Sequence, residues 1–150
     1  MRKSDGPIII EQTFNVPISF VWNAITNIEE MRKWYFENIP SFKPEVGFAT
    51  KFNVQSETRD FLHLWQVLEV IPLRLIKYNW KYANYTGDSN VVFELFEEEK
   101  KTKLKLTVEI VEDFTEDIKE FKRESCIGGW EYFIQLRLKQ YLENISNNEI

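Results

Sequence analysis

The chain has 150 residues, 43% of them hydrophobic and 15% aromatic, which suits one domain with a single core over residues 1–150. The formal net charge of -5 leaves no general positive field, so nucleic-acid binding and attraction to anionic membranes are not expected. The lone Cys126 cannot form an internal disulfide, and the N-terminal MRKSDGPIII is too short in apolar length for a signal peptide or membrane insertion. These features favour a cytoplasmic protein.

The beginning of the chain predicts a strand followed by a short helix. Residues 7–15 form a β-rich run that stops before Pro17, because proline cannot donate to a strand ladder. Residues 17–26 then place apolar side chains, including Trp22 and Ile25, at helical spacing. Proline is well tolerated in the first turn of such a helix.

A second short helix is expected within residues 27–36. Asn27 stands three residues before Glu30, and Thr26 stands three residues before Glu29. Either side chain can therefore begin the helix with a reciprocal cap. Both possibilities give two short helices joined by a corner.

Five segments with strand character follow, separated by turn residues: 48–55, 61–70, 75–82, 90–96 and 103–111. The last alternates most clearly, with Leu104 and Leu106 on one face and Lys103 and Lys105 on the other. Gly87, in NYTGDSN, is free to take a positive φ in a turn. Short connections indicate antiparallel neighbours, and the alternation indicates one wet and one covered face.

The C-terminal stretch GGWEYFIQLRLKQYLENI, residues 128–145, predicts a long amphipathic helix. A helix from Trp130 to Ile145 is about 24 Å long. Seven side chains share its apolar face: Trp130, Phe133, Ile134, Leu138, Tyr141, Leu142 and Ile145. Arg137 falls among them. Because a sheet with one covered face needs a second layer, this helix is expected to lie on it.

The predicted fold class is therefore α+β: a curved antiparallel six-stranded sheet wrapped around a long C-terminal helix, with two short helices between strands 1 and 2. This arrangement resembles the helix-grip superfamily of START lipid-transfer domains, birch-pollen allergens and polyketide cyclases, and more closely its branch of homologues of the activator of the heat-shock-protein-90 ATPase. The resemblance extends from Ile8 to Asn144. It is carried by Val21-Trp22, Ile25-Thr26, Met31…Trp34, Pro44…Gly47, Glu69-Val70…Pro72…Leu75, Tyr78, Trp80, Thr102, Leu104, Leu106, Gly129-Trp130, Leu138 and Tyr141.

The resemblance implies a cavity between the sheet and the long helix that binds a small apolar or amphipathic molecule. The candidate lining residues are Trp34, Phe36, Phe52, Trp65, Tyr78, Trp80, Trp130, Phe133 and Arg137. The alternative is that these rings simply fill the core, as aromatic residues at element periodicity usually do.

Arg137 allows two interpretations. A desolvated guanidinium is costly unless it is paired, so the side chain either reaches solvent or a structural partner, or orients the polar head of a bound ligand. The sequence leaves both open.

No catalytic, metal or cofactor site is expected. The sequence has no dinucleotide, P-loop, zinc-protease or serine-hydrolase motif. His63 is the only histidine and lacks a companion ligand, and Cys126 resembles an inert buried thiol.

Two other function classes remain. A protein-interaction module that regulates a chaperone ATPase can use the apolar segment 34–42 as a docking surface. However, the eukaryotic activators carry an additional N-terminal domain, whereas this sequence opens directly at MRKSDGPIII, so a chaperone partner is the weaker expectation. A cyclase-like enzyme is the third class. Its acid and base groups could come from an inward-facing set: Glu11, His63, Glu69, Tyr78 and Tyr82.

Overall fold

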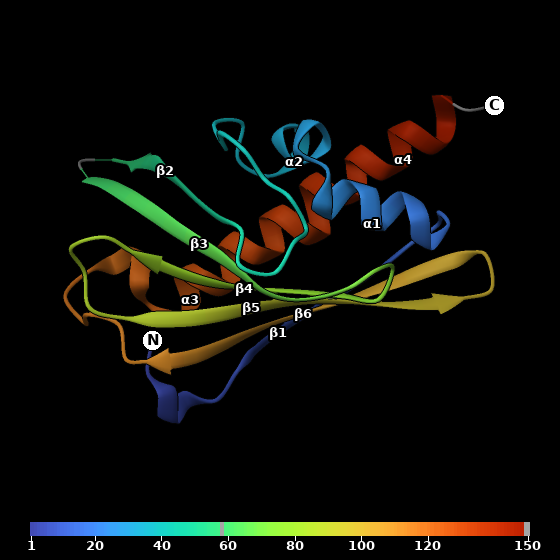
Figure 1. Ribbon diagram of the computed structural model, residues 1–150. Helices are drawn as coiled ribbons and strands as arrows, with labels where there is room; N and C mark the ends of the chain where they lie inside the picture. The colour runs from blue at the N-terminus through green and yellow to red at the C-terminus, as the bar shows by residue number, and fades with distance from the viewer. Residues whose placement is uncertain (58, 149–150) are drawn as a thin grey trace.

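The computed structural model describes residues 1–57 and 59–148 and contains one six-stranded antiparallel sheet (Figure 1). The strands are β1 (Ile8–Phe14), β2 (Ala49–Ser56), β3 (Arg59–Ile71), β4 (Leu75–Tyr82), β5 (Asp88–Glu98) and β6 (Lys101–Glu112). They lie in the order β1-β6-β5-β4-β3-β2. Only the step from β1 to β6 is not a hairpin, because the chain leaves β1 for the helices and returns at the opposite edge. The predicted fold class is confirmed.

Two short helices separate β1 from β2: α1 (Ile18–Thr26) and α2 (Ile28–Trp34). The choice between two caps is settled in favour of Asn27, whose side-chain oxygen accepts from the backbone N–H groups of Glu29 and Glu30 at 3.0 and 3.3 Å. The Thr26 hydroxyl instead donates to the Trp22 carbonyl at 2.6 Å.

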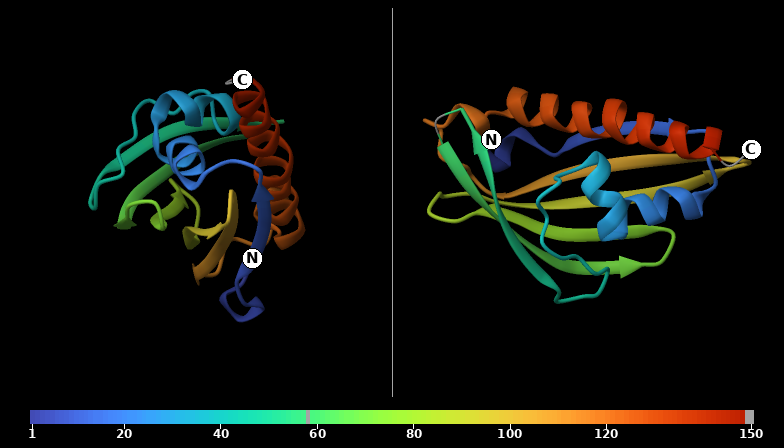
Figure 2. Two further views of the ribbon diagram at one scale, coloured as in Figure 1. Left: turned by 90° about the vertical axis from the view of Figure 1, so that its right-hand side faces the viewer. Right: turned by 90° about the horizontal axis from the view of Figure 1, so that it is seen from above.

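The C-terminal helix is a continuous rod built from α3 (Arg123–Trp130), the π-helical segment η3 (Glu131–Leu138) and α4 (Lys139–Asn148) (Figure 2). It begins at Arg123 rather than at the predicted Trp130. The early start was hidden by Gly128 and Gly129, which have low helix propensity.

Buried side chains occur at every fourth position along this rod: Trp130, Ile134, Leu138 and Leu142. In an α-helix such a stripe drifts about 40° around the axis at each step. The wider turns of a π-helix, closed by i→i+5 bonds, reduce this drift. The π-helical segment therefore keeps the four side chains on one line toward the core.

The inner face of the sheet divides into two halves. The aliphatic half comprises β1, β6 and β5 and contributes mainly Ile8, Ile10, Leu104, Leu106, Val108, Ile110, Val91 and Leu95. The aromatic half comprises β2, β3 and β4 and contributes mainly Phe52, Phe61, His63, Trp65, Tyr78, Trp80 and Tyr82. Helix α1 contacts β5 and β6, and the long helix contacts β1. The aromatic half is covered by the connection 35–48, which runs from α2 to β2 (Figure 1).

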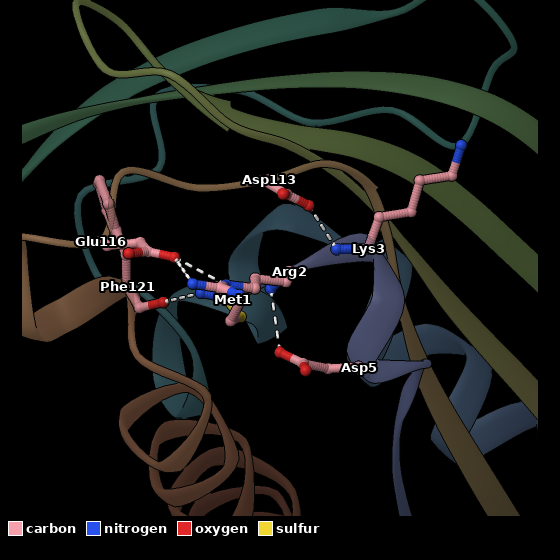
Figure 3. Close-up of polar contacts among 7 residues, drawn as sticks. All are labelled: Met1, Arg2, Lys3, Asp5, Asp113, Glu116 and Phe121. Atoms are coloured by element: carbon pink, nitrogen blue, oxygen red, sulfur yellow. Dashed lines mark hydrogen bonds and ion pairs between the residues drawn. The ribbon is translucent and has the colours of Figure 1, made fainter.

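The N-terminal segment is hydrogen-bonded to the connection between β6 and α3 (Figure 3). The amino group of Met1 donates to the Phe121 carbonyl at 2.8 Å, and the backbone N–H of Lys3 donates to the Asp113 carboxylate at 2.6 Å. Arg2 forms an ion pair with Glu116. These contacts hold the segment that links β6 to α3.

Candidate functional site

A cluster of aromatic rings fills the space between the aromatic half of the sheet and the long helix. We call it the aromatic cluster; its members are Tyr35, Phe36, Phe52, His63, Trp65, Trp80, Trp130 and Phe133. Tyr35 lies among these rings, with ring centroids 5.4 Å from Trp65, 5.9 Å from Trp130 and 5.1 Å from Phe133. The interior is therefore occupied by the chain's own rings.

Phe36 lies between the two layers of this cluster. Its ring centroid is 5.3 Å from those of Phe52 and His63 and 5.0 Å from that of Phe133. The rings of Trp65 and Trp80 follow at 6.1 and 5.9 Å. Unlike Tyr35, Phe36 is only half-buried.

The connection that carries Phe36 is fixed on both sides of it. Tyr35 is buried and its hydroxyl lies 2.9 Å from that of Tyr78. Further along, Ile39 is fully buried, and Arg32 donates to its carbonyl at 2.9 Å. Phe36 is thus a partly exposed ring between two anchored points. The apolar side chains of segment 34–42 are mostly buried, so the prediction that they offer an exposed docking surface is wrong.

Eight of the nine predicted lining residues lie in or beside the aromatic cluster. Six are members, and the other two border it. Trp34 stacks on Tyr35 at 4.5 Å and donates its indole N–H to the Ala24 carbonyl at 2.7 Å. Tyr78 lies 4.9 Å from Trp65.

Arg137 is the exception, because its guanidinium is directed away from the cluster. It donates to the Lys33 carbonyl at 2.8 Å and to the Tyr132 hydroxyl at 3.2 Å. The structure thus gives this guanidinium the structural partners that one of the two interpretations predicts.

Sequence reasoning missed Tyr35. Helix α2 ends at Trp34, so the next residue no longer follows helical periodicity. The available signal was the run of three aromatic residues at 34–36, of which only Trp34 and Phe36 were predicted to line the cavity.

The aromatic cluster contains no charged group. Burial lowers the pKa of His63 to about 4, so its imidazole is neutral near pH 7. Its Nδ1 lies 3.0 Å from the Phe61 carbonyl, which can only accept, so Nδ1 carries the proton. Burial also raises the pKa of the Tyr35 and Tyr78 hydroxyls well above the usual range. The environment is apolar and uncharged.

Three buried polar atoms of the aromatic half have no hydrogen-bond partner within the described residues: Thr50 Oγ1, Trp65 Nε1 and Trp80 Nε1. They belong to one row across the sheet, because Thr50 pairs with Trp65 and Trp65 pairs with Trp80 in the strand register. Trp80 lies close enough to the Tyr82 hydroxyl to counteract in part the rise of its pKa on burial, although the Trp80 N–H group has no hydrogen-bond partner within the described residues.

The groups considered for catalysis are not brought together. His63, Tyr78 and Tyr82 face inward, whereas Glu11 pairs with Lys103 at 2.6 Å on the outer face and Glu69 is exposed. Burial raises the pKa of the Cys126 thiol to about 11, which leaves it protonated. In the described part of the chain, no group of three or more His, Cys, Asp or Glu side chains is placed to hold a metal ion.

A curved antiparallel sheet closed by a long C-terminal helix defines a protein of the helix-grip class. Solved structures agree on this fold. Protein CV1439 from Chromobacterium violaceum superposes with a TM-score of 0.78 at 18% identity, covering 93% of this chain and 98% of that one. Protein MLL2253 from Mesorhizobium loti gives 0.70 at 23% identity, covering 92% and 97%.

A third similar structure is DynU16, described as a putative protein in the dynemicin biosynthetic locus. Its TM-score is 0.74 at 19% identity, over 93% of this chain and 48% of that one.

The family model for "Activator of Hsp90 ATPase homolog 1-like protein" matches residues 15–143, and the chain belongs to that family. No curated protein matches it. Across residues 1–57 and 59–148, none of the helices has the length and apolar character needed to cross a membrane.

Proposed function

We propose that the domain binds a small apolar or amphipathic molecule inside the aromatic cluster, in the position that Phe36 occupies. The observation that carries this proposal is the half-buried ring of Phe36, which is surrounded by rings of the sheet and the long helix. Helix-grip domains of this family commonly bind hydrophobic ligands, which supports ligand binding by this domain.

The free-energy cost of moving a side chain out of the cluster favours Phe36 over Tyr35 as the residue that a ligand displaces. Fully burying a phenylalanine side chain contributes roughly 1.5–3 kcal/mol, so moving the half-buried Phe36 into water costs about 1 kcal/mol. Such a cost lowers the apparent affinity of a ligand by only about a factor of five. Displacing Tyr35 would cost more, since it is nearly fully buried and would lose its contact with the Tyr78 hydroxyl.

The proposal can be tested with fluorene, a rigid apolar probe, and the indole N–H signals of the five tryptophans in an NMR spectrum. We expect fluorene to shift the signals of Trp65 and Trp80, whose rings contact Phe36. The signal of Trp22, which lies on α1, should stay in place. Shifts spread equally over all five signals would contradict a site in the aromatic cluster.

Two phenylalanine variants sharpen this test. Phe36→Ala removes the displaced ring in advance, so fluorene should bind more tightly to it than to the wild type. Phe20→Ala is a matched control, since Phe20 is also a half-buried ring but lies on α1. If both variants bind fluorene with wild-type affinity, Phe36 does not occupy the ligand position.

We propose regulation of a chaperone ATPase as a second function, supported by the family description alone. An increase in the ATPase rate of an Hsp90-type chaperone on adding the domain would favour it. We further propose that the domain binds its ligand without turnover, because the lowered pKa of His63, about 4, makes its imidazole a weak general base. A cytoplasmic location is supported by the single cysteine.

A further inference from the structure

Two tryptophans of the aromatic cluster bury an indole N–H group without an acceptor in the described residues. Trp65 is 2% exposed and Trp80 is 8% exposed. The large majority of buried side-chain polar atoms in proteins are hydrogen-bonded, and an unsatisfied one costs about 1–3 kcal/mol. By contrast, the buried indole N–H of Trp34, at the end of α2, does have an acceptor: it donates to the Ala24 carbonyl at 2.7 Å.

The two unpartnered donors are neighbours. Trp65 and Trp80 face each other in the register of β3 and β4, with ring centroids 5.0 Å apart. The ring of Phe36 lies against both indoles. A phenylalanine ring offers only its weakly accepting π face to an N–H group, whereas a ligand in its place could offer an oxygen.

We propose that the ligand is an uncharged molecule with a hydrogen-bond acceptor, such as the carbonyl oxygen of a ketone, quinone or ester, and that this oxygen accepts from the indole N–H groups of Trp65 and Trp80. This inference rests on the proposed function. It adds what the ligand must carry: an acceptor to satisfy the donors, and no charge, since a buried anion without a cationic partner is strongly disfavoured.

Three probes of similar shape separate these requirements: fluorene, 9-fluorenone and fluorene-9-carboxylate. Fluorenone replaces the CH2 group of fluorene by a carbonyl, and the carboxylate adds a charge. Affinities are measured by equilibrium dialysis, which does not depend on tryptophan fluorescence. The decisive quantity is the ratio of the fluorenone to the fluorene affinity, compared between variants so that differences in probe hydrophobicity cancel.

Trp65→Phe and Trp80→Phe each remove an N–H group and keep an aromatic ring. We expect each substitution to lower the ratio about three- to tenfold, the usual effect of one hydrogen bond. Trp22→Phe is the matched control: it removes the indole N–H of a tryptophan on α1, outside the aromatic cluster, so the ratio should not change. Thermal melting of each variant verifies that it is folded.

The outcomes distinguish the two proposals. If fluorene and fluorenone both bind and the ratio is the same in all variants, the acceptor inference is overturned while the proposed function stands. Fluorene-9-carboxylate binding as tightly as fluorenone would also overturn the inference. If neither fluorene nor fluorenone binds the wild type or Phe36→Ala, the proposed function fails and the inference fails with it.

Discussion

The two halves of the inner sheet face bury similar positions with different chemistry. In the aliphatic half, even the buried polar side chains are satisfied: the hydroxyl of Thr102 donates to the Val16 carbonyl at 2.9 Å, and that of Ser89 donates to the Trp80 carbonyl at 2.7 Å. In the aromatic half, the indole N–H groups of Trp65 and Trp80 have no acceptor in residues 1–57 and 59–148, and the partly exposed ring of Phe36 lies beside them. One half has the character of an ordinary core, whereas the other keeps two indole N–H groups without a partner among the described residues.

The largest expected effect separates the halves by stability. Leu106 is fully buried in the aliphatic half, so Leu106→Ala should lower the free energy of unfolding by about 3 kcal/mol or more. Phe36→Ala removes a larger side chain but should cost only about 1–2 kcal/mol, because the ring is half-buried. Urea unfolding of both variants measures the difference. Equal losses would mean that Phe36 is as essential to the core as Leu106.

Acid should destabilise the aromatic half through His63. Its folded-state pKa of about 4 lies below the usual 6.5, so the unfolded chain binds the proton more readily. Stability is therefore complete above about pH 6.5 and falls as the pH drops toward 4, by up to roughly 2–3 kcal/mol. Between pH 7 and pH 4.5 the wild type should lose more stability than His63→Phe, which lacks the titrating group. Identical losses in the two proteins would show that His63 is not buried as a neutral imidazole.

Two tryptophan variants compare a buried indole N–H group that donates a hydrogen bond with one that has no acceptor among the described residues. Trp34→Phe leaves the Ala24 carbonyl without its donor and should cost about 1–2 kcal/mol beyond the smaller ring. Trp65→Phe removes a donor that has no protein acceptor, so the loss of that group should not be costly and the total should be smaller. Thermal unfolding in the absence of ligand checks this order. A Trp65 variant less stable than the Trp34 variant would indicate that the Trp65 donor is already satisfied.

The smallest effect is expected at the turn between β5 and β6, away from the aromatic half. Glu99 has a φ of 58°, a conformation that favours glycine. Glu99→Gly should raise the free energy of unfolding by about 0.5 kcal/mol, the relief of strain being partly offset by a more flexible unfolded chain. A denaturation midpoint that falls would contradict this.

Alternation and turn residues were sufficient to predict the sheet. The expected strand at 75–82 coincides with β4, and the inward side of β6 is as predicted. The start of the long helix could not be found, because Gly128 and Gly129 interrupt the pattern that the tertiary structure overrides.

The sequence was sufficient to predict which residues surround the candidate site, but not whether the space between them is filled. Residues such as Trp65 and Trp130 could be assigned to the interior from their periodicity. Whether that interior is filled depends on the connection 35–48, which has no periodicity to read. The unpartnered indole groups likewise result from packing between distant segments, which no local pattern encodes.

The π-helical segment has a consequence for how insertions and deletions can be tolerated. Its wide turns accommodate residues that a regular α-helix would rotate out of line, so both ends of the rod face the core together. Removing the exposed Gln135 would shorten this segment by one residue, and ordinary i→i+4 bonds could then replace the wide turns without rotating one end far against the other. The middle of the rod is thus the place where losing one residue disturbs the alignment of its two ends least.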